Sequence, residues 1–189
     1  VEPGARAAVQ TTVSGRILVI ATEATIRSDV YAKAIIGLRP NAHPTAKACT
    51  LFVSMAEEGL MQGKLVEDIA HYYLDDIFGE QAVDPKPDTM ILGCTHFPLL
   101  KTALEHVVGE NVTVVDPATM VAASVQEELV RRNILIHDER TPRYHFMTTD
   151  NQERFARTGT LFLGRRLENP FIVGTLFLSA ISHAFKNPL

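Results

Sequence analysis

Short apolar runs alternate with longer segments of helical spacing along most of the chain, and this alternation constrains the fold more than any other feature. Ile17 to Ile20 forms one such run, and in the segment that follows, from Thr25 to Ile36, apolar residues recur four positions apart. A strand followed by a helix, repeated many times, is typical of a parallel sheet covered by helices. The sequence therefore predicts an α/β fold with a doubly wound parallel sheet.

The same alternation continues to about residue 163. Further strands are expected at Leu51–Val53, Met90–Leu92, Val112–Val115 and Tyr144–Met147. Helices are expected over Leu65–Phe78, from Pro98 onward, over Val121–Leu129 and over Asn151–Leu163. A proline suits the first turn of a helix, because its missing N–H would have no partner there. Five strands alternating with helices are thus predicted.

Composition and charge exclude several classes of protein. A hydrophobic fraction of 46% and a charged fraction of 21% are typical of globular proteins. The net charge of −4 comes without a basic run, so no nucleic-acid partner is expected. The longest apolar stretch, Phe171 to Ile181, is about half of the roughly 20 residues that span a membrane. Two distant cysteines and no signal pattern favour a cytoplasmic protein without disulfides.

The residues that follow the expected strands share a small, hydroxylic or ionisable character. They include Thr22, Ser54, Cys94, Asp116 and Thr148. In open α/β sheets ligands bind beyond the carboxyl ends of the strands. Loops are polar in general, so the pattern carries little weight alone. It indicates a pocket for a compact polar ligand.

The third strand leads into the most reactive sequence, Cys94-Thr95-His96, before a helix that begins with Pro98. A thiol beside the amino terminus of a helix is favoured as the thiolate, and the same N–H groups could bind a substrate carboxylate. His96 could exchange a proton with the thiol. Two other interpretations stay open at this point. Cys94 could be a buried packing residue, or Cys94 and His96 could be two of the four ligands that structural zinc usually needs.

The segment from Gly93 to Leu100, GCTHFPLL, resembles the second cysteine motif of the glutamate racemases, in the aspartate/glutamate racemase family. Aspartate racemases have a similar cysteine but usually lack the Thr-His-aromatic-Pro sequence, so the glutamate branch is favoured. Three further segments resemble the same family: VEPGARAA at 1–8, ATEATIRS at 21–28 together with Tyr31, and CTLFVSMAEEG at 49–59. The resemblance extends to about Pro170.

The resemblance implies an enzyme that uses neither pyridoxal phosphate nor a metal. Inversion of a stereocentre needs a base on one face and an acid on the other, and two opposed thiols supply both. Cys94 would be one of these catalytic thiols. Thr95 and His96 would contact the substrate, and His96 would also assist proton transfer. Glu57 would be an acidic helper, with Glu58 as the alternative, although both could simply lie in a solvated first turn of a helix. Cys49 is expected to be a packing residue.

Two motifs that the resemblance implies do not occur: an Asp-Ser pair in a Gly-rich turn, and a cysteine before Asn-Thr. We interpret the chain as the carboxyl-terminal part of a racemase. Residues 1–116 would form one near-complete domain carrying the Cys94 motif, and residues 117–170 the returning part of a second, pseudo-symmetric α/β domain. Residues 171–189 would be an atypical tail, in which GTLFL of 159–163 recurs at 174–178.

Three functions stay open on this basis. The first is a fragment, inactive alone, of an enzyme that interconverts L- and D-glutamate for peptidoglycan in the cell wall. The second is a non-catalytic binding module that keeps the fold and an anion pocket. The third is a related thiol-based aspartate racemase or an isomerase of other small dicarboxylates. A small-molecule substrate is expected in each case, with no nucleic-acid or membrane partner, and a homodimer is left open.

Overall fold

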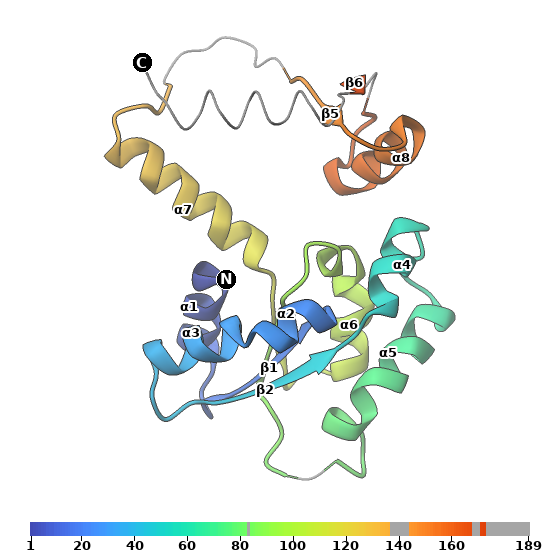
Figure 1. Ribbon diagram of the computed structural model, residues 1–189. Coiled ribbons are helices and arrows are strands. Elements are labelled where there is room, and N and C mark those ends of the chain that lie inside the picture. Colours follow the sequence, from blue (N-terminus) through green and yellow to red (C-terminus); the bar gives the residue numbers. More distant parts are fainter. Residues whose placement is uncertain (83, 137–143, 168–170, 173–189) are drawn as a thin grey trace. The chain divides into compact units, whose positions relative to one another are not determined.

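The computed structural model describes residues 1–82, 84–136, 144–167 and 171–172 (Figure 1). Residues 1–136 form one compact unit, and a second unit begins at His137. The predicted domain boundary after Asp116 and the predicted tail from residue 171 stay predictions.

The first unit is built on a four-stranded sheet. Its strands are β1 (Arg16–Ala21), β2 (His43–Ala48), β3 (Thr89–Leu92) and β4 (Thr113–Val115). They are parallel and lie in the order β2-β1-β3-β4. The central strands β1 and β3 are almost fully buried, as expected for continuous apolar runs covered on both faces. The predicted α/β class with a parallel sheet is confirmed.

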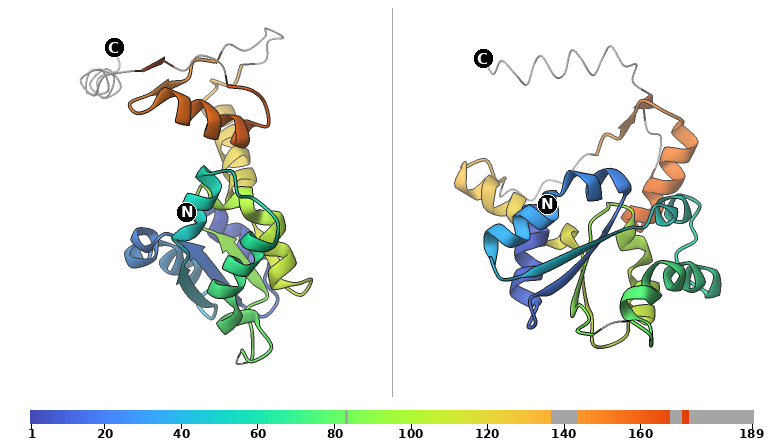
Figure 2. Two further views of the ribbon diagram at one scale, coloured as in Figure 1. Left: turned by 90° about the vertical axis from the view of Figure 1, so that its right-hand side faces the viewer. Right: turned by 60° about the horizontal axis from the view of Figure 1, so that its bottom comes forward.

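Helices cover both faces of this sheet (Figure 2). Side chains alternate between the faces of a strand, so Ile17 and Val19 pack toward one layer and Leu18 and Ile20 toward the other. The layer on the first face holds α1 (Glu2–Thr11) and α3 (Val30–Leu38). The layer on the second holds α4 (Leu51–Glu57), α5 (Lys64–Phe78) and α6 (Lys101–Val108). The sheet is therefore doubly wound, as predicted.

The second strand was predicted in the wrong place. Leu51–Val53 begins helix α4, in which Phe52, Met55 and Ala56 are buried at helical spacing. Ser54 therefore does not end a strand. The observed strand β2 has no buried residue and contains Pro44. This strand lies at the edge of the sheet, where a missing N–H is tolerated. Few of its side chains need to be apolar there, so its sequence does not show the apolar run by which the other strands were predicted.

The helix expected over Thr25–Ile36 is two helices. The first, α2 (Glu23–Ser28), ends where Asp29 adopts a left-handed conformation with φ of 58°, and α3 begins directly after it. A short polar side chain is among the few that tolerate this conformation. The break turns α3 so that Tyr31 and Ile35 are its buried residues.

Helix α7 (Pro117–Arg131) follows β4. Asp116 caps it, since its side chain accepts a hydrogen bond of 2.9 Å from the N–H of Ala118. No residue of α7 is buried, and Val121 and Val125 on its surface are 42% and 53% exposed. The first turn packs against α1, where a Cβ added to Gly4 would lie 3.0 Å from Pro117.

In the second unit, α8 (Gln152–Leu163) lies between two short strands, β5 (Met147–Thr148) and β6 (Phe171–Ile172). The expected fifth strand of the main sheet therefore begins later than Tyr144 and pairs with β6 instead, in parallel. The repeat at 174–178 and the rest of the apolar stretch after Ile172 lie outside the described residues. Within the described residues, no helix is both long and apolar enough to span a membrane.

Candidate active site

The turn after β3 holds the reactive sequence. A side chain on Gly93 would meet the carbonyl oxygen of Ile20 at 2.9 Å, so only glycine lets this turn lie against β1. After the turn, a 3₁₀ segment (Phe97–Leu100) continues directly into α6. Phe97 is fully buried, and its N–H donates to the carbonyl oxygen of Cys94 at 3.2 Å. The helix expected at Pro98 thus begins as a 3₁₀ turn, and the sequence Cys94 to His96 lies just before it.

Three side chains form a connected row at this turn. The Cys94 sulfur lies 3.9 Å from Nδ1 of His96, and Nε2 of His96 lies 3.4 Å from Oε1 of Glu57 at the end of α4. The side chains of His96 and Glu57 are only about a quarter exposed, 25% and 26%. A neutral His96 that carries its proton on Nε2, toward the carboxylate, presents Nδ1 to the thiol as an acceptor. The row can therefore move a proton off Cys94.

A cavity of about 480 Å³ opens beside the thiol. The lining includes Tyr31, Gly93, Cys94, Thr95, Asp116 and Val121. These residues come from α3, from the turn after β3 and from the junction of β4 with α7, so the carboxyl ends of two neighbouring strands border the cavity. This is the place where ligands bind in open α/β sheets. His96 and Glu57 are not among the lining residues and reach the cavity only through Cys94.

The surroundings of the thiol also affect Tyr31. Burial, and to a smaller degree the charge of Cys94, raises the pKa of this phenol above its usual value. Tyr31 therefore stays uncharged beside the thiol over the ordinary pH range. It was noted in the sequence only as part of a resembling segment. Its position at the cavity follows from the packing of α3, which no spacing within the sequence shows.

The second cysteine has a different environment. Cys49 is fully buried in the core with Phe52 and Leu74, as expected for a packing residue. Burial raises the pKa of its thiol to about 12. Cys49 is therefore a poor nucleophile or base in the folded chain.

The structure brings Cys94, His96 and Glu57 together, and places Thr95 on the same turn beside the cavity. The carboxylate of Glu57 lies 3.4 Å from His96, and the other candidate glutamate, Glu58, is the residue at the carboxyl-terminal cap of α4. Their roles stay predictions. No cluster of three metal-binding side chains occurs within the described residues.

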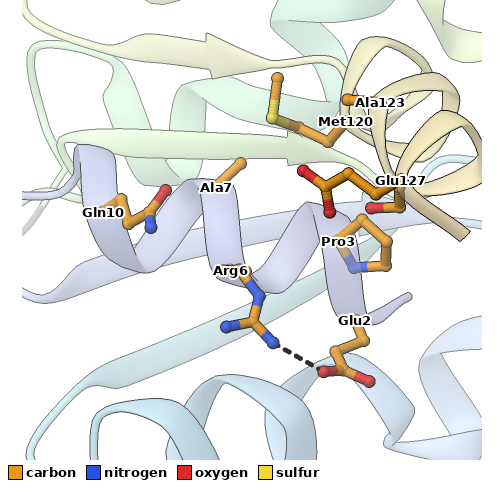
Figure 3. A pocket seen from close by; sticks show the side chains of 9 residues that line it. Glu2, Pro3, Arg6, Ala7, Gln10, Met120, Ala123 and Glu127 are labelled. Atoms are coloured by element: carbon orange, nitrogen blue, oxygen red, sulfur yellow. Dashed lines mark hydrogen bonds and ion pairs between the residues drawn. The ribbon is translucent and has the colours of Figure 1, made fainter. Parts of the chain in front are cut away.

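A second hollow of about 500 Å³ lies between α1 and α7 (Figure 3). Its polar lining includes Glu2, Arg6, Gln10 and Glu127, and Arg6 donates to Glu2 at 2.8 Å. Neither cysteine nor histidine is among its lining residues. It therefore offers charge and hydrogen bonds but no group suited to proton transfer near neutral pH.

Comparison with known proteins gives a consistent set of relatives, although no family model matches the chain. The chain is 40% identical over 173 residues to the glutamate racemase of Geobacter metallireducens, which covers 92% of the chain and 62% of that relative. It is 35% identical over 166 residues to the glutamate racemase of Levilactobacillus brevis, covering 88% of the chain and 58% of the relative. The chain thus spans about three fifths of the length of the relatives it matches.

Solved structures give the same picture. The glutamate racemase of Francisella tularensis, solved in complex with D-glutamate, matches with a TM-score of 0.80 at 31% identity, over 91% of this chain and 61% of that one. The glutamate racemase of Thermus thermophilus, solved in complex with β-chloro-D-alanine, matches with a TM-score of 0.76 at 32% identity, over 93% and 62%.

Proposed function

The chain is a relative of glutamate racemases along about nine-tenths of its own length, and from this premise we propose that it forms the carboxyl-terminal part of such an enzyme. In that enzyme Cys94 is one of two groups that exchange the α-proton of glutamate. One observation carries the proposal: the thiol of Cys94 borders a cavity and is linked through His96 to the carboxylate of Glu57.

The proposed reaction begins with a proton transfer inside the row. His96 accepts the proton of the Cys94 thiol, and Glu57 stabilises the imidazolium that forms. The Cys94 thiolate then removes the α-proton from one face of the substrate. An acid on the opposite face returns a proton to the α-carbon, which inverts the stereocentre. In the reverse direction the Cys94 thiol donates and the opposite group removes the proton.

The opposite acid–base group is proposed to lie in the part of the racemases that this chain does not cover. Among the described residues, Cys94 is the one cysteine that lines the cavity, and Cys49 is buried in the core. The chain alone therefore presents an acid–base thiol on one side of the cavity. Taken by itself, it would act as a binding module, which is the second function that the geometry supports.

Thr95 is proposed to bind the substrate together with the N–H groups of the turn. Its hydroxyl and those N–H groups are donors that suit a carboxylate. The Francisella tularensis relative was solved with D-glutamate, which supports glutamate as the ligand of this cavity. A dicarboxylate of another length, as in an aspartate racemase, is the alternative substrate.

The wider role is proposed from the family resemblance. The parent enzyme would work without a cofactor in the cytoplasm, supply D-glutamate for peptidoglycan, and form a homodimer. The acid–base role of Cys94 depends on none of these properties. Each of them can therefore be disproved without affecting that role.

The test is a fused enzyme, in which residues 1–189 follow the part of the Geobacter metallireducens relative that the chain does not cover. Optical rotation of L-glutamate measures racemisation. We expect the fused enzyme to racemise glutamate, residues 1–189 alone to be inactive, and Cys94→Ser to remove most of the activity of the fused enzyme. Racemisation by residues 1–189 alone, or by the Cys94→Ser fusion at the unmodified rate, would show that the proposal is wrong.

A further inference from the structure

Tyr31 lies between two glycines that belong to different parts of the first unit. It is only 8% exposed, and it is among the residues that line the cavity beside Cys94. A Cβ added to Gly93 would lie 3.2 Å from one edge of the Tyr31 ring. A Cβ added to Gly4 would lie 3.7 Å from the other.

The Tyr31 ring supports the turn that carries Cys94 through its contact with Gly93. Gly93 immediately precedes Cys94, and its Cα is also held against Ile20 and Ala21 of β1, at 2.9 and 3.1 Å from an added Cβ. The backbone that carries the thiol is thus confined between β1 and a flat aromatic ring. A ring in this position has little freedom, since interiors are close-packed.

The other edge of the Tyr31 ring faces Gly4 of α1. Gly4 lies in α1, where it packs against Pro117, the first residue of α7. Pro117 and its neighbour Ala118 line the same cavity as Cys94. The Tyr31 ring therefore lies between the turn that carries the thiol and the part of α1 that packs against the start of α7.

We propose that Tyr31 is a positioning residue for Cys94: its ring, which packs closely on Gly93 and faces Gly4 with its other edge, sets where the thiol stands in the cavity. The proposal rests on the proposed function, because a position matters only if the thiol has to meet a substrate. A displacement of about 1 Å in a reacting group can lower a rate by roughly 10²-fold. Since its raised pKa keeps the phenol neutral, Tyr31 also brings no second negative charge beside the thiolate.

The first test needs only residues 1–189. The rate at which iodoacetamide alkylates Cys94 is measured by mass spectrometry for the unmodified chain, Tyr31→Phe, Tyr31→Ala and Ile35→Ala. Ile35 is the matched control, because it is fully buried one turn along the same helix and packs in the same core cluster. It is not among the lining residues of the cavity.

Loss of the ring should open space beside the thiol. We expect Tyr31→Ala to alkylate faster by about 5-fold or more, and Tyr31→Phe and Ile35→Ala to stay within about 2-fold of the unmodified chain. Thermal unfolding shows which variants fold, and Tyr31→Leu, which lacks the flat ring, replaces Tyr31→Ala if the latter does not. An unchanged rate in the ring-less variant, or an equal increase in Ile35→Ala, would overturn the proposal.

The second test uses the fused enzyme. Tyr31→Ala should lower kcat by about 10-fold or more with little change in KM, and Tyr31→Phe should restore most of it. Unchanged kcat in Tyr31→Ala would contradict a positioning role even if alkylation changed. If the fused enzyme with Tyr31 intact does not racemise glutamate, the proposed function has failed, while the alkylation rates still decide what Tyr31 does for the thiol.

Discussion

Two hollows of similar size, about 480 and 500 Å³, lie beside α7, and they differ in the chemistry of their walls. Ala118, Val121 and Ala122 line the first, whereas Met120, Ala123 and Ser124 line the second. Helical spacing places these two sets on different faces of α7. The same helix thus contributes to both hollows, but Cys94 borders only the first.

The two hollows therefore differ in the chemistry of their walls although their volumes are similar. The first hollow is bordered by the turn at the carboxyl end of β3, which carries the Cys94 thiol and, next to it, His96. The second is bordered by the sides of two helices, and the Arg6 and Glu2 side chains that line it are already paired with each other at 2.8 Å. The thiol and the histidine follow the end of a strand, whereas Glu57 comes from the end of helix α4.

Removal of the thiol should produce the largest effect. In the fused enzyme, Cys94→Ser should lower kcat by about 10²- to 10⁴-fold with little change in KM, because proton transfer is lost while the binding groups remain. Cys49→Ser is the matched control and should retain activity wherever it folds. Steady-state kinetics with both enantiomers measures the change. Near-normal racemisation by the Cys94→Ser enzyme would show that the thiol does not make the first hollow the site of catalysis.

Filling each hollow in turn sharpens the comparison. Ala122 and Ala123 are adjacent and exposed on α7, but the first lines the hollow beside Cys94 and the second lines the other. We expect Ala122→Phe to weaken glutamate binding by about 10-fold or more, since the added ring occupies the cavity. Ala123→Phe should change binding by about 2-fold or less. Calorimetric titration with D-glutamate measures both, and equal effects would contradict the assignment.

A substitution of Glu57, which contacts His96 behind the thiol, should lower activity less than the loss of Cys94 does. Glu57→Gln keeps the shape of the side chain but removes the charge that stabilises protonated His96. We expect kcat of the fused enzyme to fall by about 10-fold, with KM nearly unchanged. Glu58→Gln, one residue further, should leave kcat within about 2-fold. If Glu58→Gln is the more damaging variant, the other candidate glutamate takes this role.

Asp88, at the opposite end of β3, should affect stability and not activity. Burial raises the pKa of this carboxyl, but hydrogen bonds from the Ser14 N–H and the Thr12 and Ser14 hydroxyls, among others, lower it to about 2. A lowered pKa stabilises the fold above the unfolded value of 3.8, and this stability is lost as pH falls toward 2. Asp88→Asn should lower the free energy of unfolding at pH 7 by about 1–2 kcal/mol. Urea unfolding at pH 7 and below pH 3 tests this, because the difference should shrink in acid.

The sequence predicted those parts of the fold that depend on apolar runs. Most residues of β1, β3 and β4 are buried and form short apolar runs, so these strands were found. Strand β2 lies at the edge of the sheet, and its sequence, HPTAKA, shows no apolar alternation. The three apolar residues Leu51–Val53 were mistaken for it, because so short a run fits a helix face and a strand equally well.

The site was predictable where its residues are adjacent in the sequence. Cys94, Thr95 and His96 lie in one turn, and their motif identified them together. Glu57 is far away in the chain, and only the packing of α4 brings its carboxylate to His96. Tyr31 was noted within a resembling segment, but its place between two glycines depends on three separate elements. Long-range packing of this kind leaves no periodic signal in the sequence.

The most direct test of the central claim, that Cys94 acts on one face of the substrate, is hydrogen exchange in D₂O. The Cys94→Ala fused enzyme is incubated with L-glutamate and with D-glutamate, and NMR follows the α-hydrogen of each. One remaining acid–base group can remove and return the proton on its own face only. The account predicts exchange without inversion for one enantiomer and no exchange for the other. Equal exchange of both enantiomers, or continued racemisation, would contradict it.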